Sequence, residues 1–171
     1  NMEIREGELA TLSGRTGAGK STVFKLVLGL YAPRRGTVRI QGVDPRSLTG
    51  PQRRALYGYV EQTFHRVPGT VKDQITLYDD SFTMEEVREA ATIAGLDATI
   101  EQLEKGYDTL CTSEIFSQGQ WQLLSIARAI AAGPQILLLD EITANLDAGT
   151  EQTVLDALQR AGQNRTVVSI S

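Results

Sequence analysis

A glycine-rich loop between a predicted strand and a predicted helix constrains this chain more than any other feature. Residues 14–21 read GRTGAGKS, which fits the phosphate-binding pattern G-x-x-x-x-G-K-[ST]. Residues 8–13 have the pattern of a short strand, and residues 20–30 carry apolar side chains at helical spacing. An ordinary glycine-rich surface turn is the alternative, and it is disfavoured because the residue pattern and its context agree.

The residue types in this loop suit a nucleotide phosphate. Glycines allow the backbone to wrap closely around an anion, and the start of the following helix adds its positive dipole end. Lys20 is predicted to reach the β and γ phosphates, and Ser21 to bind Mg²⁺. The predicted nucleotide contacts in the loop are Gly14, Arg15, Thr16, Gly17, Ala18, Gly19, Lys20, Ser21 and Thr22.

A second motif supplies the acids that hydrolysis needs. Residues 135–141 read QILLLDE, and a continuous apolar run of this length is typical of a central parallel strand that is buried on both faces. Asp140 and Glu141 follow it, at the sheet edge where α/β folds bind ligands. Asp140 is predicted to support Mg²⁺ and Glu141 to act as the general base for the attacking water. An ordinary acidic turn would be the simpler interpretation if the phosphate loop were absent.

The remaining patterns predict an α/β fold with an inserted helical lobe. Further strands are expected at residues 37–42, 56–62 and 165–171. Residues 68–106 have a helical character, and Thr83 with Glu86 forms a capping box. Helices are also expected over residues 117–132, where Ser117 caps the start, and over residues 147–162.

These elements predict a core with a mostly parallel sheet flanked by helices. The expected division assigns residues 1–62 and about 134–171 to this core and about 63–133 to the helical subdomain. The first and last residues suggest a piece of a longer protein, because the chain stops inside an apolar run.

Composition narrows the possible partners. The formal charge of −4 disfavours nucleic acid, which usually selects a basic surface. The single cysteine, Cys111, cannot pair within the chain, which fits a reducing compartment and leaves no cysteine-based metal cluster. Apolar residues make up 41% of the chain, but no run approaches a membrane span.

Taken together, the motifs resemble those of the ATP-binding cassette (ABC) family along nearly the whole chain. GRTGAGKST resembles the Walker A motif, YVEQ ending in Gln62 the Q-loop, and ILLLDE the Walker B strand. FSQGQ at residues 116–120 resembles the family's signature, usually LSGGQ, with Phe116 in place of Leu and Gln118 in place of Gly. ANLD ending in Asp147 resembles the D-loop. The order and spacing of these motifs also match.

The resemblance implies a mechanism. Two ABC domains pair head to tail around two ATP molecules, so that each ATP meets Walker A of one domain and the signature of the other. Gln62 would complete Mg²⁺ coordination and assist catalysis with Lys20, and Asp147 would bridge the two domains. The signature residues implied to contact nucleotide are Ser117, Gln118, Gly119 and Gln120. The family's switch histidine and adenine-stacking aromatic would lie outside this segment.

Within the family, PGTVKDQI and GYDT resemble the exporter branch. This resemblance implies that the domain hydrolyses ATP at the cytoplasmic face of a membrane and thereby drives transport. It also implies a partner membrane domain, which in exporters is usually fused to the ATP-binding domain. The alternatives are a non-transport ABC ATPase acting on nucleic acid or ribosomes and a degenerate regulatory cassette. The compact insert and the lack of a C-x-x-C pair weigh against the first, and intact Lys20, Asp140 and Glu141 weigh against the second.

Three conspicuous residues have plainer interpretations. His65, the only histidine, is predicted to be a solvated loop residue, because it follows Gln62 too closely to be the switch histidine. Cys111 is predicted to be a plain small residue near the boundary of the helical lobe. Trp121 could lie at a dimer face or pack within its own lobe.

Overall fold

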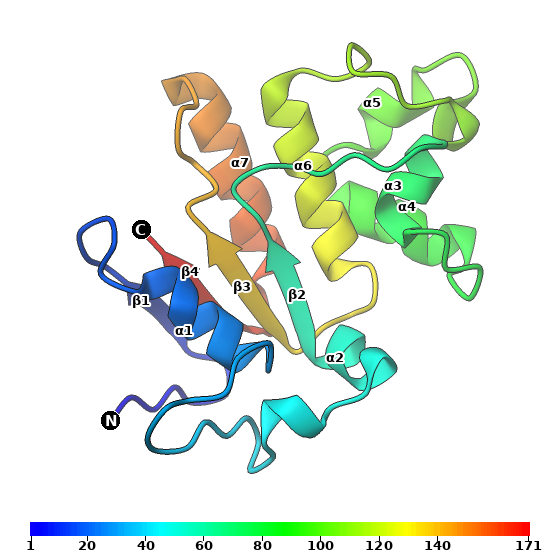
Figure 1. The fold of residues 1–171 in the computed structure, drawn as a ribbon. Helices are drawn as coiled ribbons and strands as arrows, with labels where there is room; N and C mark the ends of the chain where they lie inside the picture. Colours follow the sequence, from blue (N-terminus) through cyan, green and yellow to red (C-terminus); the bar gives the residue numbers. More distant parts are fainter.

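A computed structural model describes all residues from 1 to 171 and confirms the predicted α/β class (Figure 1). Its centre is a 4-stranded, fully parallel sheet in the order β1-β4-β3-β2. The strands are β1 (Leu9–Leu12), β2 (Tyr57–Val60), β3 (Ile136–Asp140) and β4 (Thr166–Ile170). The helices are α1 (Lys20–Val27), α2 (Gly50–Leu56), α3 (Val71–Thr76), α4 (Met84–Ile93), α5 (Asp97–Glu101), α6 (Gln118–Ile130) and α7 (Ala148–Ala161).

The apolar strand β3 is central and covered on both faces, as its sequence predicts. Leu137 and Leu138 are each 0% exposed although they point to opposite faces. Leu137 and Leu139 belong to the larger core cluster, whereas Leu138 belongs to the smaller one. By the same alternation, Asp140 lies on the Leu138 face of the sheet.

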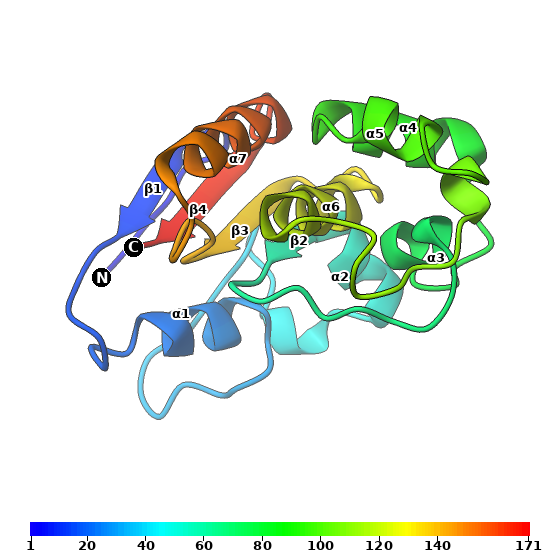
Figure 2. The ribbon, with the colours of Figure 1, turned by 90° about the horizontal axis from the view of Figure 1, so that it is seen from above.

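Helices cover the two faces unequally (Figure 2). On one face, α1 places Phe24 against Leu138 and Val168 in the smaller cluster. On the other face, α6 and α7 pack side by side and contribute to the larger cluster, which includes Leu124 and Val154. The phosphate loop and the start of α6 therefore approach the sheet from opposite sides.

The helical lobe is built from α3, α4 and α5, which lie beside α6 (Figure 1). Capping boxes start two of these helices: Thr70 pairs with Asp73 before α3, and Thr83 pairs with Glu86 before α4. In each box the threonine hydroxyl accepts a backbone N–H and the acid side chain accepts another, which satisfies donors that a helix start leaves free. The hydrogen bonds between Thr83 and Glu86 confirm the capping box predicted from the sequence.

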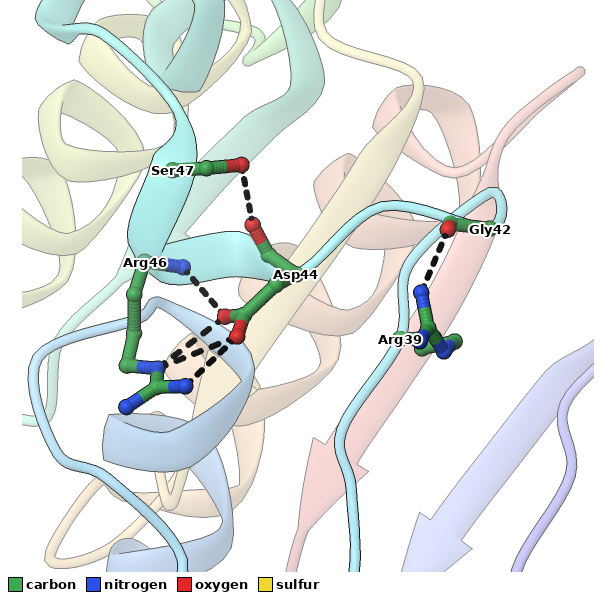
Figure 3. A network of polar contacts seen from close by, with 5 residues as sticks. All are labelled: Arg39, Gly42, Asp44, Arg46 and Ser47. Carbon is green, nitrogen blue, oxygen red and sulfur yellow. Dashed lines mark hydrogen bonds and ion pairs between the residues drawn. The ribbon is translucent and has the colours of Figure 1, made fainter.

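One predicted strand is wrong. Residues 37–42 form no strand, and only an isolated antiparallel bridge links Ile40 to Val43. The alternating pattern alone does not suffice, because a strand is stable only when a neighbour completes its hydrogen bonds, and no strand of the sheet pairs with this segment. The segment instead closes a turn in which Arg39 donates to the Gly42 carbonyl (Figure 3).

Helix α1 is also shorter than predicted. It ends at Val27 rather than continuing to Leu30, because Gly29 adopts a left-handed φ of 73°. Only glycine fits there, since a Cβ atom would overlap the Pro45 carbonyl. The chain then reaches a short 3-10 turn, η1 (Pro45–Ser47), capped by Asp44 (Figure 3). Hydrogen bonds from Arg46 lower the pKa of Asp44 to about 2.

Candidate nucleotide-binding site

The glycine-rich loop presents backbone donors to solvent. Gly17 and Gly19 have φ values of 84° and 88°, a left-handed conformation that glycine adopts without strain. Gly19 is the N-cap of α1 and offers no side-chain acceptor to the helix start. The N–H groups of Gly17, Gly19, Lys20 and Ser21 donate to no acceptor within the chain. Free N–H groups at a helix start form a site suited to an anion such as phosphate.

Lys20 joins this loop to the ends of two strands. Its side chain is only 12% exposed, and Nζ donates to the carbonyls of Gly14 and, at 2.7 Å, of Ser171, which follows β4. Nζ also lies 3.9 Å from Oε1 of Glu141, just beyond β3. The fold thus brings the predicted phosphate lysine and the predicted general base together, although they lie far apart in the sequence.

The two acids, Asp140 and Glu141, lie in different environments. Asp140 ends β3, and its Oδ2 accepts a 2.9 Å hydrogen bond from the Tyr59 hydroxyl on β2. Glu141 is 39% exposed at its side chain and has a left-handed φ of 46°. A non-glycine residue in this region costs roughly 1–3 kcal/mol, and such strain concentrates at functional sites. The strained turn directs the Glu141 carboxylate toward Lys20.

Gln62 lies in the loop after β2, at the same sheet edge as Asp140. Val60 pairs with Leu139 in parallel register, so Gln62 and Asp140 leave neighbouring strands within a residue or two of that pair. The Gln62 carbonyl accepts a 2.8 Å hydrogen bond from Nε2 of Gln122 on α6. Helix α6 therefore holds the backbone of the predicted Q-loop.

An aromatic cluster reinforces this attachment. Trp121 stacks on Phe64 with centroids 5.3 Å apart and meets Phe116 edge-on at 5.1 Å. These contacts agree with the interpretation that Trp121 packs within its own lobe. The Arg128 guanidinium lies 4.1 Å from the Phe64 ring centroid and donates to the carbonyls of His65, at 2.9 Å, and Gln74, at 2.5 Å.

Sequence reasoning missed Phe64 and Arg128 as anchors of the Q-loop. The available signal was an arginine at position 128 inside an otherwise buried apolar helix. A half-buried arginine needs acceptors, and here carbonyl oxygens accept from its Nε and Nη1.

The signature residues surround the start of α6. Ser117 caps the helix as predicted and forms a capping box with Gln120. Gln118 is exposed, whereas Gly119 is buried. A Cβ atom on Gly119 would overlap the Thr150 Cγ2 methyl of α7, closer than the 3.0 Å that real Cβ contacts respect. A glycine at this position therefore allows α6 and α7 to approach closely.

Gly119→Ala is expected to lower the free energy of unfolding by about 1–3 kcal/mol, the usual cost of adding a methyl group to a packed contact. Thr150→Ser removes the clashing methyl but keeps the hydroxyl that donates to Asp147. The double variant should recover most of the loss in urea unfolding. Equal stability of the single variant and the parent would contradict this packing role.

Asp147 caps α7. Its carboxylate accepts from the N–H groups of Gly149 and Thr150, each at 3.1 Å, and from the Thr150 hydroxyl. These bonds, chiefly that of the Thr150 side chain, lower the pKa of Asp147. The predicted D-loop residue Asp147 thus contacts Thr150, whose methyl group lies against Gly119 of the signature. The D-loop and the signature therefore form one surface.

The two minor residues lie as predicted. His65 is 72% exposed at its side chain in the loop after Gln62. Cys111 is half-buried, and burial raises the pKa of its thiol to about 11, which keeps the thiol neutral at physiological pH.

The residues present fit Mg·ATP. The free N–H groups and the Lys20 ammonium suit phosphate oxygens, and a hydroxyl, an amide and a carboxylate (Ser21, Gln62 and Asp140) come from segments that meet at or beside the sheet edge. No group of three or more His, Cys, Asp or Glu side chains gathers to hold a metal ion. Mg²⁺ usually keeps several waters and is bound through one or two carboxylates plus substrate phosphates, so the hydroxyl, amide and carboxylate named above are chemically suited to it.

The parallel sheet, the glycine-rich loop at the start of α1 and the acids after β3 define a P-loop nucleoside triphosphatase fold. The family model described as "ABC transporter" matches residues 1–144. The chain therefore belongs to the ABC transporter family.

Known relatives agree with this assignment. The chain is 38% identical over its whole length to ABC transporter B family member 1 of Dictyostelium discoideum. It is 41% identical over 98% of its length to an uncharacterized ABC transporter ATP-binding protein of Bacillus subtilis (strain 168). Among solved structures, a bacterial Atm1-family ABC exporter with ATP bound matches 99% of the chain with a TM-score of 0.83 and 35% identity.

These relatives are much longer than the chain. It spans 19% and 28% of the two relatives and 30% of the exporter chain. No helix of the structure has the length and apolar character needed to cross a bilayer.

Proposed function

We propose that residues 1–171 form the nucleotide-binding domain of an exporter-type ABC transporter, which binds and hydrolyses ATP to drive a substrate across a membrane. The observation that carries this proposal is the meeting of Lys20 and Glu141, 3.9 Å apart, between the free N–H groups of the loop and the carboxyl edge of the sheet. The names of two relatives, an ABC transporter and an Atm1-family ABC exporter, support the transport role.

In this proposal the loop from Gly14 to Thr22 wraps the phosphates through backbone N–H groups, and Lys20 donates to the β and γ phosphates. Ser21, Gln62 and Asp140 would hold Mg²⁺, which would supply positive charge next to the phosphate oxygens. Lys20 already points into this space, because its contacts with Gly14 and Ser171 hold the side chain there.

Glu141 acts as the general base. Its carboxylate would accept a proton from the attacking water, while Lys20 stabilises charge on the phosphoryl oxygens. The side chain is 39% exposed and makes no hydrogen bond within the chain, so both carboxylate oxygens are free to accept from water. The left-handed turn at Glu141 holds the carboxylate at the sheet edge beside the loop.

The placement of the signature supports a head-to-tail dimer. Helix α1 and its phosphate loop lie on one face of the sheet, and α6 lies on the other (Figure 2). Ser117 to Gln120 therefore face away from the phosphate loop of the same chain, and they meet a nucleotide when a second domain supplies it. Asp147, which shares a surface with Gly119, would contact that second domain.

The remaining parts of the proposal concern the whole protein. The core is assigned to residues 1–62 and about 134–171, and the helical subdomain to about 63–133, in which α6 packs on the sheet and links it to α3 and α4. A fused membrane domain would contact the helical subdomain and place the chain at the cytoplasmic face of the membrane. The contacts of Gln122 with Gln62 and of Arg128 with His65 support a coupling of the Q-loop to that subdomain.

The full-length protein in lipid vesicles is expected to release phosphate from ATP only when Mg²⁺ is present, and EDTA should abolish the release because the proposed site needs the metal.

Duplex DNA should leave the rate of phosphate release unchanged and bind no tighter than about 10⁻⁴–10⁻⁶ M at physiological salt. Phosphate release and a DNA titration by fluorescence anisotropy check both points. A salt-resistant nanomolar complex with DNA would instead favour a non-transport ATPase.

A further inference from the structure

Tyr59 is a side chain that the family motifs leave without a role. It lies on β2 and pairs in register with Leu138, so it shares the face of the sheet on which Asp140 lies. Its hydroxyl donates to Oδ2 of Asp140 at 2.9 Å. This is the only hydrogen bond that the Asp140 carboxylate makes within the chain.

The tyrosine ring is held in place from the side of the phosphate loop. Phe24 of α1 meets it edge-on, with centroids 6.0 Å apart and planes at 83°. Phe24 is 1% exposed and lies one turn after Lys20. Tyr59 therefore connects the helix that begins at the phosphate loop with the strand that ends at Asp140. Burial, followed by the bond to Asp140, raises the pKa of Tyr59, so the hydroxyl remains a donor at physiological pH.

This contact has a chemical consequence for Asp140. A carboxylate has lone pairs on both oxygens and rotates about its Cβ–Cγ bond. The Tyr59 bond occupies one site on Oδ2 and fixes the plane of the carboxylate, which leaves Oδ1 free. Partners that orient a ligating group in this way contribute about 10- to 100-fold to metal affinity in known sites.

We propose that Tyr59 is a positioning residue, which orients the Asp140 carboxylate for Mg²⁺ in the nucleotide complex. The inference rests on the proposed function, in which Asp140 supports Mg²⁺. Tyr59 itself contacts neither nucleotide nor metal, and it acts through Asp140.

Tyr59→Phe tests this in the full-length protein, since it removes the hydroxyl and keeps the ring that packs on Phe24. The readout is the ratio of the ATP Kd in EDTA to the ATP Kd in Mg²⁺, measured with a fluorescent ATP analogue. The ratio should fall about 10-fold, through weaker binding in Mg²⁺, while the Kd in EDTA stays at the parent value.

Tyr57→Phe is the matched control. Tyr57 lies on the same strand and face, is 7% exposed, and its hydroxyl donates to the Val27 carbonyl at 2.8 Å, away from Asp140. Its loss should leave the ratio unchanged. In an Asp140→Asn background, Tyr59→Phe should have no further effect, because its partner is already altered.

The possible outcomes separate the two levels of the proposal. A parent protein whose ATP affinity is insensitive to Mg²⁺ contradicts the proposed function and this inference with it. A Mg²⁺-sensitive parent whose ratio survives Tyr59→Phe overturns the inference alone. The inference is also overturned if Tyr57→Phe lowers the ratio equally, or if Tyr59→Phe acts undiminished in the Asp140→Asn background.

Discussion

Glu141→Gln is expected to lower ATP hydrolysis by about 10²–10⁴-fold while ATP binding survives, because the amide keeps the shape of the side chain but cannot accept the proton of the attacking water. The full-length variant should accumulate as an ATP-bound dimer, since the complex forms but does not turn over. Phosphate release and size-exclusion chromatography with and without ATP measure the two effects.

Glu89→Gln serves as the control, because Glu89 is exposed on α4 and the same chemical change there lies outside the proposed site. It should hydrolyse ATP at the parent rate. If Glu141→Gln also retained the parent rate, another group would have to be the base, and the strained turn at Glu141 would need a different explanation.

Lys20→Ala is expected to weaken ATP binding about 10- to 150-fold, because one charge-assisted hydrogen bond is worth about 1.5–3 kcal/mol. Hydrolysis should fall as well, since Lys20 also stabilises charge on the transferred phosphoryl group. Titration with a fluorescent ATP analogue gives the affinity. Thermal unfolding reports whether losing the contacts of Lys20 with Gly14 and Ser171 loosens the fold.

Lys25→Ala is the matched control on the same helix. Lys25 is exposed in the last turn of α1, and its ammonium lies 5.3 Å from the Tyr31 ring centroid rather than at the loop. Its removal should leave the ATP Kd unchanged. An unchanged Kd in Lys20→Ala would show that the loop is not the phosphate site.

Local patterns were sufficient to predict most elements. The apolar run before Asp140 predicted a buried central strand, and Leu137 and Leu138 are fully buried. The capping box of Thr83 with Glu86 and the cap at Ser117 predicted helix starts, because caps of this kind involve residues that are close in sequence and need no distant contact. The strand expected at residues 37–42 was wrong, since strand formation depends on a neighbour that the local pattern cannot reveal.

The sequence by itself determined the chemistry of the site: a lysine after a glycine loop, two acids after an apolar strand, and a serine that caps a helix. Each is a short motif whose local geometry follows from the strand, turn or helix in which its residues lie. Only the tertiary structure decided which of these groups meet. Parallel pairing brings Glu141 to Lys20 and Tyr59 to Asp140, while the sheet separates Ser117 from the loop. These relations depend on strand order and on the face each side chain occupies, which are set by packing between segments far apart in the chain.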